Sequence, residues 1–177
     1  MFREWAPNAK EIYLIGDFND WKEHGDYRMY HVKNSPGVWE VELQSGAIKH
    51  GDLYKLKVRW NGGEGERIPA WANRVVQDEQ TKIFSAQVWE PENPYRFRKK
   101  VFRAKTDPLM IYECHIGMAQ EEERVGTYNE FREKILPRIA EAGYNCIQIM
   151  AIQEHPYYGS FCYHVSSFFA PSSRFCT

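Results

Sequence analysis

The sequence lacks an excess of charge of either sign and any long hydrophobic run. Its 177 residues include 23 lysines and arginines against 24 aspartates and glutamates, which gives a formal net charge of −1. A broad nucleic-acid-binding or polybasic membrane-binding surface needs a basic excess, so we expect neither kind of partner. No apolar stretch approaches the roughly 20 residues that cross a bilayer, and residues 1–5 hold no apolar signal-peptide region.

Cysteine is scarce, and its spacing does not suit a metal. Cys114, Cys146, Cys162 and Cys176 form no C-x-x-C pair and no cysteine–histidine cluster with zinc spacing. We therefore expect no metal site and no cofactor. Without a secretory signal, these residues fit reduced thiols better than a disulfide framework, so the expected location is the cytoplasm.

Aromatic residues are abundant, at 15% of the chain, including 6 tryptophans. Two explanations stay open from composition alone. The rings can fill a core, or some can be exposed surfaces on which flat ligands such as sugar rings stack.

Residues 1–90 have the pattern of an antiparallel β-structure. A short apolar run covers 11–15, and alternation covers 38–43 and 54–60. In 54–60, one face carries Tyr54, Leu56, Val58 and Trp60, and the other carries Lys55, Lys57 and Arg59. Period-two alternation with one polar face indicates half-buried strands. Turn sequences at 34–37, 44–46 and 61–63 separate them, so we predict an all-β sandwich in which Trp39 and Trp60 belong to the core.

Residues 91–108 hold three prolines and a basic run at 96–100 and are predicted to be a linker. Residues 109–177 then alternate strand and helix. Residues 109–113 and 146–152 predict buried strands of a parallel sheet. Between them, Thr127 and Glu130 predict a helix start with a capping box. Pro137 is expected to kink or divide that helix, and Gly143 to end it.

This strand–helix–strand order suits the start of a (β/α)₈ barrel. Such a barrel takes roughly 250 residues, so about 70 residues suffice for only about two of its units. We therefore expect 109–177 to be an incomplete barrel and the chain to be a piece of a longer protein.

Several ordered motifs together resemble a known enzyme family. They are WAPNA at 5–9, GDFNDW at 16–21, LMIYECHIG at 109–117, LPRI at 136–139 and GYNCIQIMAIQEH at 143–155, continued by 157–158 and 166–175. The first two resemble the carbohydrate-binding module that precedes branching and debranching enzymes. The whole set is similar to the 1,4-alpha-glucan branching enzymes of the alpha-amylase superfamily, glycoside hydrolase family 13.

The resemblance implies an immunoglobulin-like module, a catalytic barrel and a C-terminal β domain. It implies cleavage of an α-1,4-glucan and transfer of the segment to form an α-1,6 branch, by a retaining mechanism with an aspartate nucleophile and a glutamate acid/base. In the family both carboxylates follow later barrel strands, so no catalytic residue can be assigned here. The 177 residues alone are expected to be inactive.

The same resemblance supplies candidate substrate-binding residues for an α-glucan such as glycogen or starch. Tyr163 matches the family tyrosine that stacks under a sugar in the active site, and Trp21 matches a stacking tryptophan of the module. Lys55 or Lys57 matches a lysine that binds glucan hydroxyls. Stretches associated with substrate contact hold the remaining candidates, which are Trp5, Ala6, Pro7, Asn34 and Gly37.

Two cysteines depart from the family pattern. Cys162 and Cys176 stand where the family has glycine, which supplies backbone freedom in such loops. Sequence error, engineering and divergence all stay open as explanations. Two other functional hypotheses also stay open: a non-catalytic glucan-binding protein, and a debranching or trehalose-releasing relative.

Overall fold

The computed structural model describes residues 1–97, 108–150, 152–161 and 163–175. The chain divides into two compact units, one formed by Met1–Glu92 and Ser167–Pro171, the other by Asn93–Ser166 and Ser172–Thr177. Part of the predicted linker, 98–107, lies outside the described residues. None of the described helices has the length and apolar character needed to cross a membrane.

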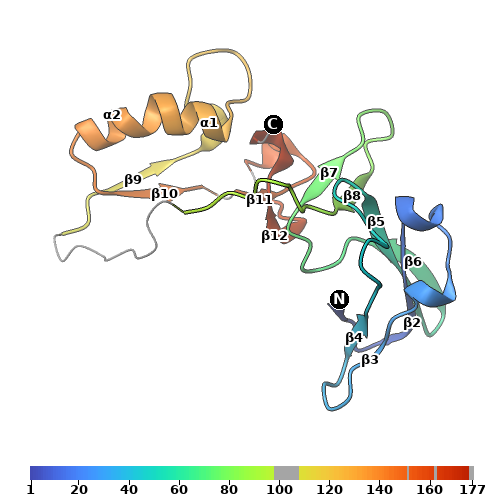
Figure 1. The fold of residues 1–177 in the computed structure, drawn as a ribbon. Helices are drawn as coiled ribbons and strands as arrows, with labels where there is room; N and C mark the ends of the chain where they lie inside the picture. Colours follow the sequence, from blue (N-terminus) through green and yellow to red (C-terminus); the bar gives the residue numbers. More distant parts are fainter. Residues whose placement is uncertain (98–107, 151, 162, 176–177) are drawn as a thin grey trace. The chain divides into compact units, whose positions relative to one another are not determined.

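The first unit is built from two antiparallel sheets (Figure 1). One sheet has the strand order β1-β4-β3, and the other has the order β2-β5-β8-β7 with β6 paired to β5. The strands are β1 (Phe2–Trp5), β2 (Ala9–Gly16), β3 (Tyr30–His31), β4 (Val38–Val41), β5 (Leu53–Trp60), β6 (Gly63–Arg67), β7 (Val75–Gln77) and β8 (Phe84–Gln87). Short 3₁₀ turns η1 (Asp17–Asn19) and η2 (Gly25–Tyr27) follow β2.

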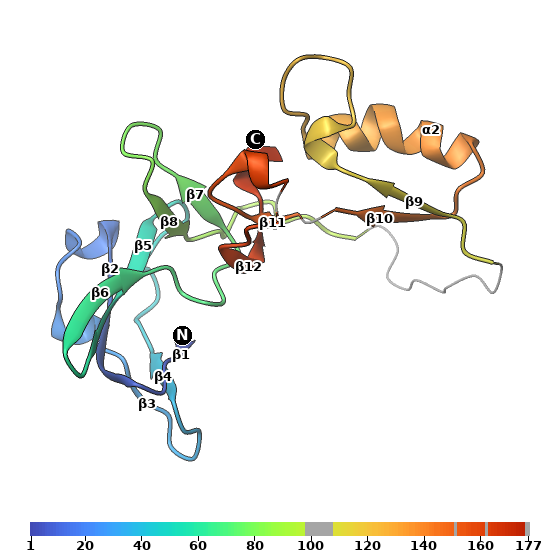
Figure 2. The same ribbon diagram turned by 180° about the vertical axis from the view of Figure 1, so that it is seen from behind.

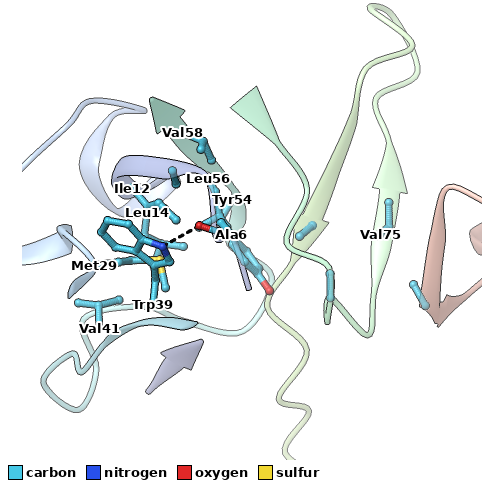
Figure 3. Close-up of a cluster of buried hydrophobic side chains, with 14 residues drawn as sticks. Ala6, Ile12, Leu14, Met29, Trp39, Val41, Tyr54, Leu56, Val58 and Val75 are labelled. Atoms are coloured by element: carbon cyan, nitrogen blue, oxygen red, sulfur yellow. Dashed lines mark hydrogen bonds between the residues drawn. The ribbon is translucent and has the colours of Figure 1, made fainter. Parts of the chain in front are cut away.

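Side chains of both sheets share one hydrophobic core. Trp39 and Val41 of β4 belong to the same buried cluster as Leu14 of β2 and Leu56 of β5 (Figure 3). The Trp39 indole N–H donates to the carbonyl of Ala6 at 3.0 Å, so its polar edge is satisfied inside the core. The strands predicted at 11–15, 38–43 and 54–60, and the burial of Trp39, are confirmed.

The prediction that Trp60 belongs to the core is wrong. Trp60 has the correct parity, because Tyr54, Leu56 and Val58 on the same face are buried. However, it is the last residue of β5, and 45% of its surface is exposed. Parity selects the face of a strand, but the extent of the opposing layer decides how much of that face is covered.

The second unit contains a pair of parallel strands, and the chain between these two strands forms a helix (Figure 2). β9 (Ile111–Cys114) pairs with β10 (Cys146–Ile149). The helical segment runs through α1 (Tyr128–Glu130), the π-helical turn η4 (Phe131–Ile135) and α2 (Leu136–Glu141). The remaining elements are η3 (Ile116–Met118), β11 (Gln153–Glu154), η5 (Tyr158–Ser160) and η6 (Ser173–Phe175), and β12 (Ser167–Pro171) lies in the first unit.

The predicted helix boundaries are confirmed. Thr127 Oγ1 accepts from the Glu130 N–H, and the Glu130 carboxylate accepts in return from the Thr127 N–H, which completes the capping box. Pro137 has no N–H to continue the α-helical ladder, and the bonding before α2 widens to the π-helical turn η4. Gly143 follows α2 with φ +92, a left-handed conformation that glycine adopts without strain.

The capping box gives this helix a predictable acid sensitivity. Arg124, and then Thr127, hold the pKa of Glu130 at about 2. The native state therefore keeps this carboxylate ionised, and its stabilisation is fully present above the ordinary pKa of about 4.3. It is lost as pH falls from there toward 2. Substitution E130Q should flatten this part of the pH–stability curve, measured by urea unfolding followed by circular dichroism. If E130Q lost as much stability between about pH 4 and pH 2 as the unsubstituted chain, this prediction would be contradicted.

The prediction of parallel strands within 109–113 and 146–152 is confirmed, but the prediction that they are buried is wrong for the described residues. Leu109, Met110 and Ile111 are exposed, and β10 is only half-buried. Residue 151 lies outside the described residues. A parallel strand is buried on both faces only when other strands and helices cover it, and among the described residues one helical segment covers one face of this pair. The described part of the chain thus holds a single β–α–β unit and no closed barrel.

Candidate functional site

Trp21 is held at a sharply turned corner that follows β2. Asp20 and Trp21 both have left-handed backbone conformations, with φ of 53 and 58, which is costly for a bulky side chain. Hydrogen bonds hold this conformation: the Trp21 N–H donates to Gly16 O at 2.9 Å, and its indole Nε1 donates to Asp17 Oδ1 at 2.9 Å. The other oxygen of Asp17 accepts from the Leu53 N–H at 2.7 Å. The exposed indole is therefore fixed relative to both β2 and β5.

The polar face of β5 forms a ladder of ion pairs with β6. Lys55 Nζ lies 3.6 Å from Glu66, and Lys57 Nζ lies 2.7 Å from Glu64. Arg59 contacts Glu64 and also two carboxylates outside β6, those of Glu11 and Glu23. Hydrogen bonds from Lys57, and then Arg59, lower the pKa of Glu64. The lysines are thus half-buried, ion-paired groups rather than freely solvated chains.

The ladder and the corner meet at a shallow groove of about 290 Å³. Its lining includes Trp21, Lys57, Glu66, Ile15, Lys22 and Glu23. Lys55 Nζ lies 6.0 Å from the centre of the Trp21 ring. The structure therefore brings Trp21 close to Lys55 and Lys57, which the sequence placed together on a separate strand. The result is an exposed aromatic face beside cationic and anionic hydrogen-bonding groups.

A second set of predicted residues gathers around the end of β1. A Cβ built on Gly37 would lie 2.9 Å from Pro7 Cβ and 3.1 Å from Trp5 Nε1, and Gly37 has φ +79. Glycine is thus needed both for space and for backbone conformation. The Gly37 carbonyl accepts from the Ala6 N–H at 2.7 Å. Trp5, Pro7 and Gly37 therefore form one cluster.

The other three candidate residues do not line the groove beside Trp21. The Ala6 side chain is buried, although its backbone borders the cluster. Asn34 is exposed at a left-handed turn position with φ 64. Tyr163 is exposed in the second unit, and its N–H donates to Ser160 O at 3.0 Å. Cys162 and Cys176 lie outside the described residues.

The buried polar pair Glu154 and His155 has a structural part in the second unit. Both are fully buried. The Glu154 carboxylate accepts from the N–H groups of His155 at 3.0 Å and Ser173 at 2.8 Å. Over the described ranges, no group of three or more histidine, cysteine, aspartate or glutamate residues could hold a metal ion.

Comparison with known proteins identifies the relatives of this chain. Residues 1–72 match the family model described as carbohydrate-binding module 48 (isoamylase N-terminal domain). The chain is 45% identical over 180 residues to the 1,4-alpha-glucan-branching enzyme 2-2 of Arabidopsis thaliana, covering 98% of this chain and 22% of that protein. It is 41% identical over 182 residues to the 1,4-alpha-glucan-branching enzyme of Dictyostelium discoideum, covering 99% of this chain and 26% of that protein.

The chain thus resembles 1,4-alpha-glucan-branching enzymes over nearly its whole length. It spans about a quarter of the length of these curated relatives. The resemblance inferred from the motifs is confirmed.

Solved structures show the same fold in more distant enzymes. The pullulanase from Bacillus acidopullulyticus matches with a TM-score of 0.74 at 16% identity, over 99% of this chain and 24% of that one. The type I pullulanase from Bacillus subtilis matches with a TM-score of 0.70 at 19% identity, over 98% and 26%. At such identities the likeness concerns the fold alone.

Sequence reasoning missed part of the candidate site. Glu64 and Glu66 orient the two lysines, and Arg67 fixes the backbone near Trp5. A signal for β6 was present: in 63–67, charged residues alternate with the two glycines before Arg67. This alternation places the two glutamates beside the lysines only when β6 pairs with β5, and the pattern of 63–67 alone does not specify that partner.

Proposed function

We propose that this chain is the N-terminal part of an enzyme that cleaves an α-1,4-glucan and transfers the segment to form an α-1,6 branch. The identity of 41–45% to curated branching enzymes over nearly the whole chain supports this assignment over a debranching relative. The described residues include no assigned catalytic carboxylate. The part of the function that these residues perform is glucan binding.

The observation that carries the glucan-binding proposal is the arrangement of Trp21 beside Lys55 and Lys57. A sugar ring presents C–H groups on its face and hydroxyls on its rim. An aromatic face buries the former, and charged hydrogen-bonding groups bind the latter. Because Trp21 is fixed by its hydrogen bonds to Asp17 and Gly16, little conformational entropy is lost when a ligand stacks on it.

The finer architecture is proposed on the same resemblance. Residues 1–90 would be an immunoglobulin-like module, 91–108 a linker and 109–177 the beginning of the catalytic (β/α)₈ barrel. In the barrel, loops after strands build the active site, and Tyr163 would stack under the sugar there. Trp5, Ala6, Pro7, Asn34 and Gly37 would border the glucan on the module. A cytoplasmic location is also proposed.

Substitution W21A tests the glucan-binding role. Loss of a central tryptophan from a small interface weakens binding by about tenfold or more, so we expect that loss in affinity for maltoheptaose, measured by isothermal titration calorimetry on the 177-residue chain. K57Q should weaken binding by a smaller factor, since Trp21 would remain.

The matched control is W71A, because Trp71 is also exposed and does not line the groove beside Trp21. It should bind like the unsubstituted chain. Equal affinities of W21A and the unsubstituted chain would exclude Trp21 as the stacking surface. No detectable binding by the unsubstituted chain would contradict glucan binding by these residues.

A further inference from the structure

The corner that carries Trp21 needs support from side chains, because its backbone is strained. Asp20 and Trp21 both have left-handed conformations, and such conformations persist only where surrounding contacts enforce them. The corner lies directly against the start of β5, since a Cβ on Gly16 would collide with the carbonyl oxygen of Leu53. The support must therefore come from side chains that join the corner to these neighbours.

Asn19 supports only the backbone of the corner. Its Oδ1 accepts from the Gly16 N–H at 2.9 Å, and its Nδ2 donates to the Leu14 carbonyl at 3.0 Å. Both partners are backbone groups, so these bonds close the turn without restraining the Trp21 ring. The ring can still change rotamer about its own side-chain bonds unless another group holds it.

Asp17 holds the ring itself. Its Oδ1 accepts from the Trp21 indole Nε1–H at 2.9 Å, while its Oδ2 accepts from the Leu53 N–H at 2.7 Å. Leu53 is the first residue of β5, the strand that carries Lys55 and Lys57. One carboxylate thus joins the indole to this strand by two charge-assisted hydrogen bonds. An asparagine in this place could not replace both, because its second terminal group is an N–H₂ donor.

We propose that Asp17 is a positioning residue for glucan binding, which holds the Trp21 ring in a fixed orientation relative to Lys55 and Lys57. This inference rests on the proposed function, in which a glucan stacks on Trp21. Asp17 is not among the described residues that line the groove beside that ring, so it acts on the ligand through Trp21. Without this carboxylate the ring would sample several orientations, and a ligand would have to immobilise it at a cost in binding free energy.

Substitution D17N tests this role in the 177-residue chain. The affinity for maltoheptaose, measured by isothermal titration calorimetry, should fall by about three- to tenfold, the usual effect of losing one such hydrogen bond. The matched control is D20N, which removes the same charge from the same corner. The indole and the Leu53 N–H both donate to Asp17 and not to Asp20, and asparagine suits a left-handed conformation. D20N should therefore bind like the unsubstituted chain.

The Trp21 indole N–H signal in a ¹⁵N nuclear magnetic resonance spectrum separates positioning from a general loss of structure. This signal, assigned with W21F, should move in D17N without any ligand, while the other indole signals stay in place. In the unsubstituted chain, the Trp21 indole N–H should exchange with water more slowly than that of Trp71, whose ring is also exposed. The exchange measurement needs no variant, so the test stands even if D17N fails to fold.

Three outcomes would overturn this inference, and they can be told apart. Equal affinities of D17N and the unsubstituted chain would exclude the role of Asp17 and leave glucan binding by Trp21 intact. An indole N–H of Trp21 that exchanges as fast as that of Trp71 would also exclude it, because the hydrogen bond to Asp17 would then not persist. If the unsubstituted chain does not bind maltoheptaose, the proposed function and this inference are both overturned.

Discussion

Substitution W39A is expected to lower the free energy of unfolding of the first unit by about 3–5 kcal/mol, the usual cost of removing a large aromatic side chain from a core. Only 4% of the Trp39 surface is exposed, and its ring packs in the cluster shared by the two sheets (Figure 3). The substitution would also leave the Ala6 carbonyl without its indole donor. Urea unfolding followed by tryptophan fluorescence would measure the change.

The control for this prediction is W71A, where 49% of the tryptophan surface is exposed. Exposed substitutions away from special backbone features usually change stability by about 0.5 kcal/mol or less. A W39A variant no less stable than W71A would show that the two sheets do not depend on this contact.

The second large effect is expected at Phe175 of the second unit. Its ring is 1% exposed and lies against the rings of Tyr128, His115, His155 and Tyr158, at centroid distances of 5.6 to 6.5 Å. Substitution F175A would remove the residue that these rings share. We expect a loss of about 3–5 kcal/mol from the stability of this unit.

Amide hydrogen exchange measures this effect unit by unit. Protection of the backbone amides of α2 should fall in F175A, whereas that of β5 should not, because the two segments belong to different compact units. The matched control is F168A, which removes a phenylalanine that is 71% exposed and should leave protection of α2 unchanged. Unchanged protection of α2 in F175A would contradict the central role of this ring.

Local features of the chain could be predicted from sequence because few neighbouring residues decide them. Alternation in 54–60 specifies which side chains share a face, whatever packs against them. The capping box of Thr127 and Glu130 closes within one helical turn. The family could be recognised for a different reason: five motifs in a fixed order identify a relative even where single motifs are weak.

Exposure and ion pairing could not be predicted in this way, because they depend on segments that are distant in the sequence. Trp60 has the parity of the core but is half-exposed at the end of β5, where its partner on β6 is Gly63. The strands at 109–113 and 146–152 have buried composition, but their burial depends on neighbours that the described residues do not supply. Glu154 is buried, and its carboxylate is satisfied by Ser173 from a later segment of the second unit.

The sequence alone therefore determined several strands, the helix boundaries, the family resemblance and the types of residue that suit a glucan. The tertiary structure decided which of those residues meet. Pairing of β5 with β6 joins Lys55 and Lys57 to Glu66 and Glu64 on one face and lays Trp60 over two glycines on the other. The physical reason is that side-chain periodicity is a property of one strand, whereas a binding groove is a property of several strands held in register.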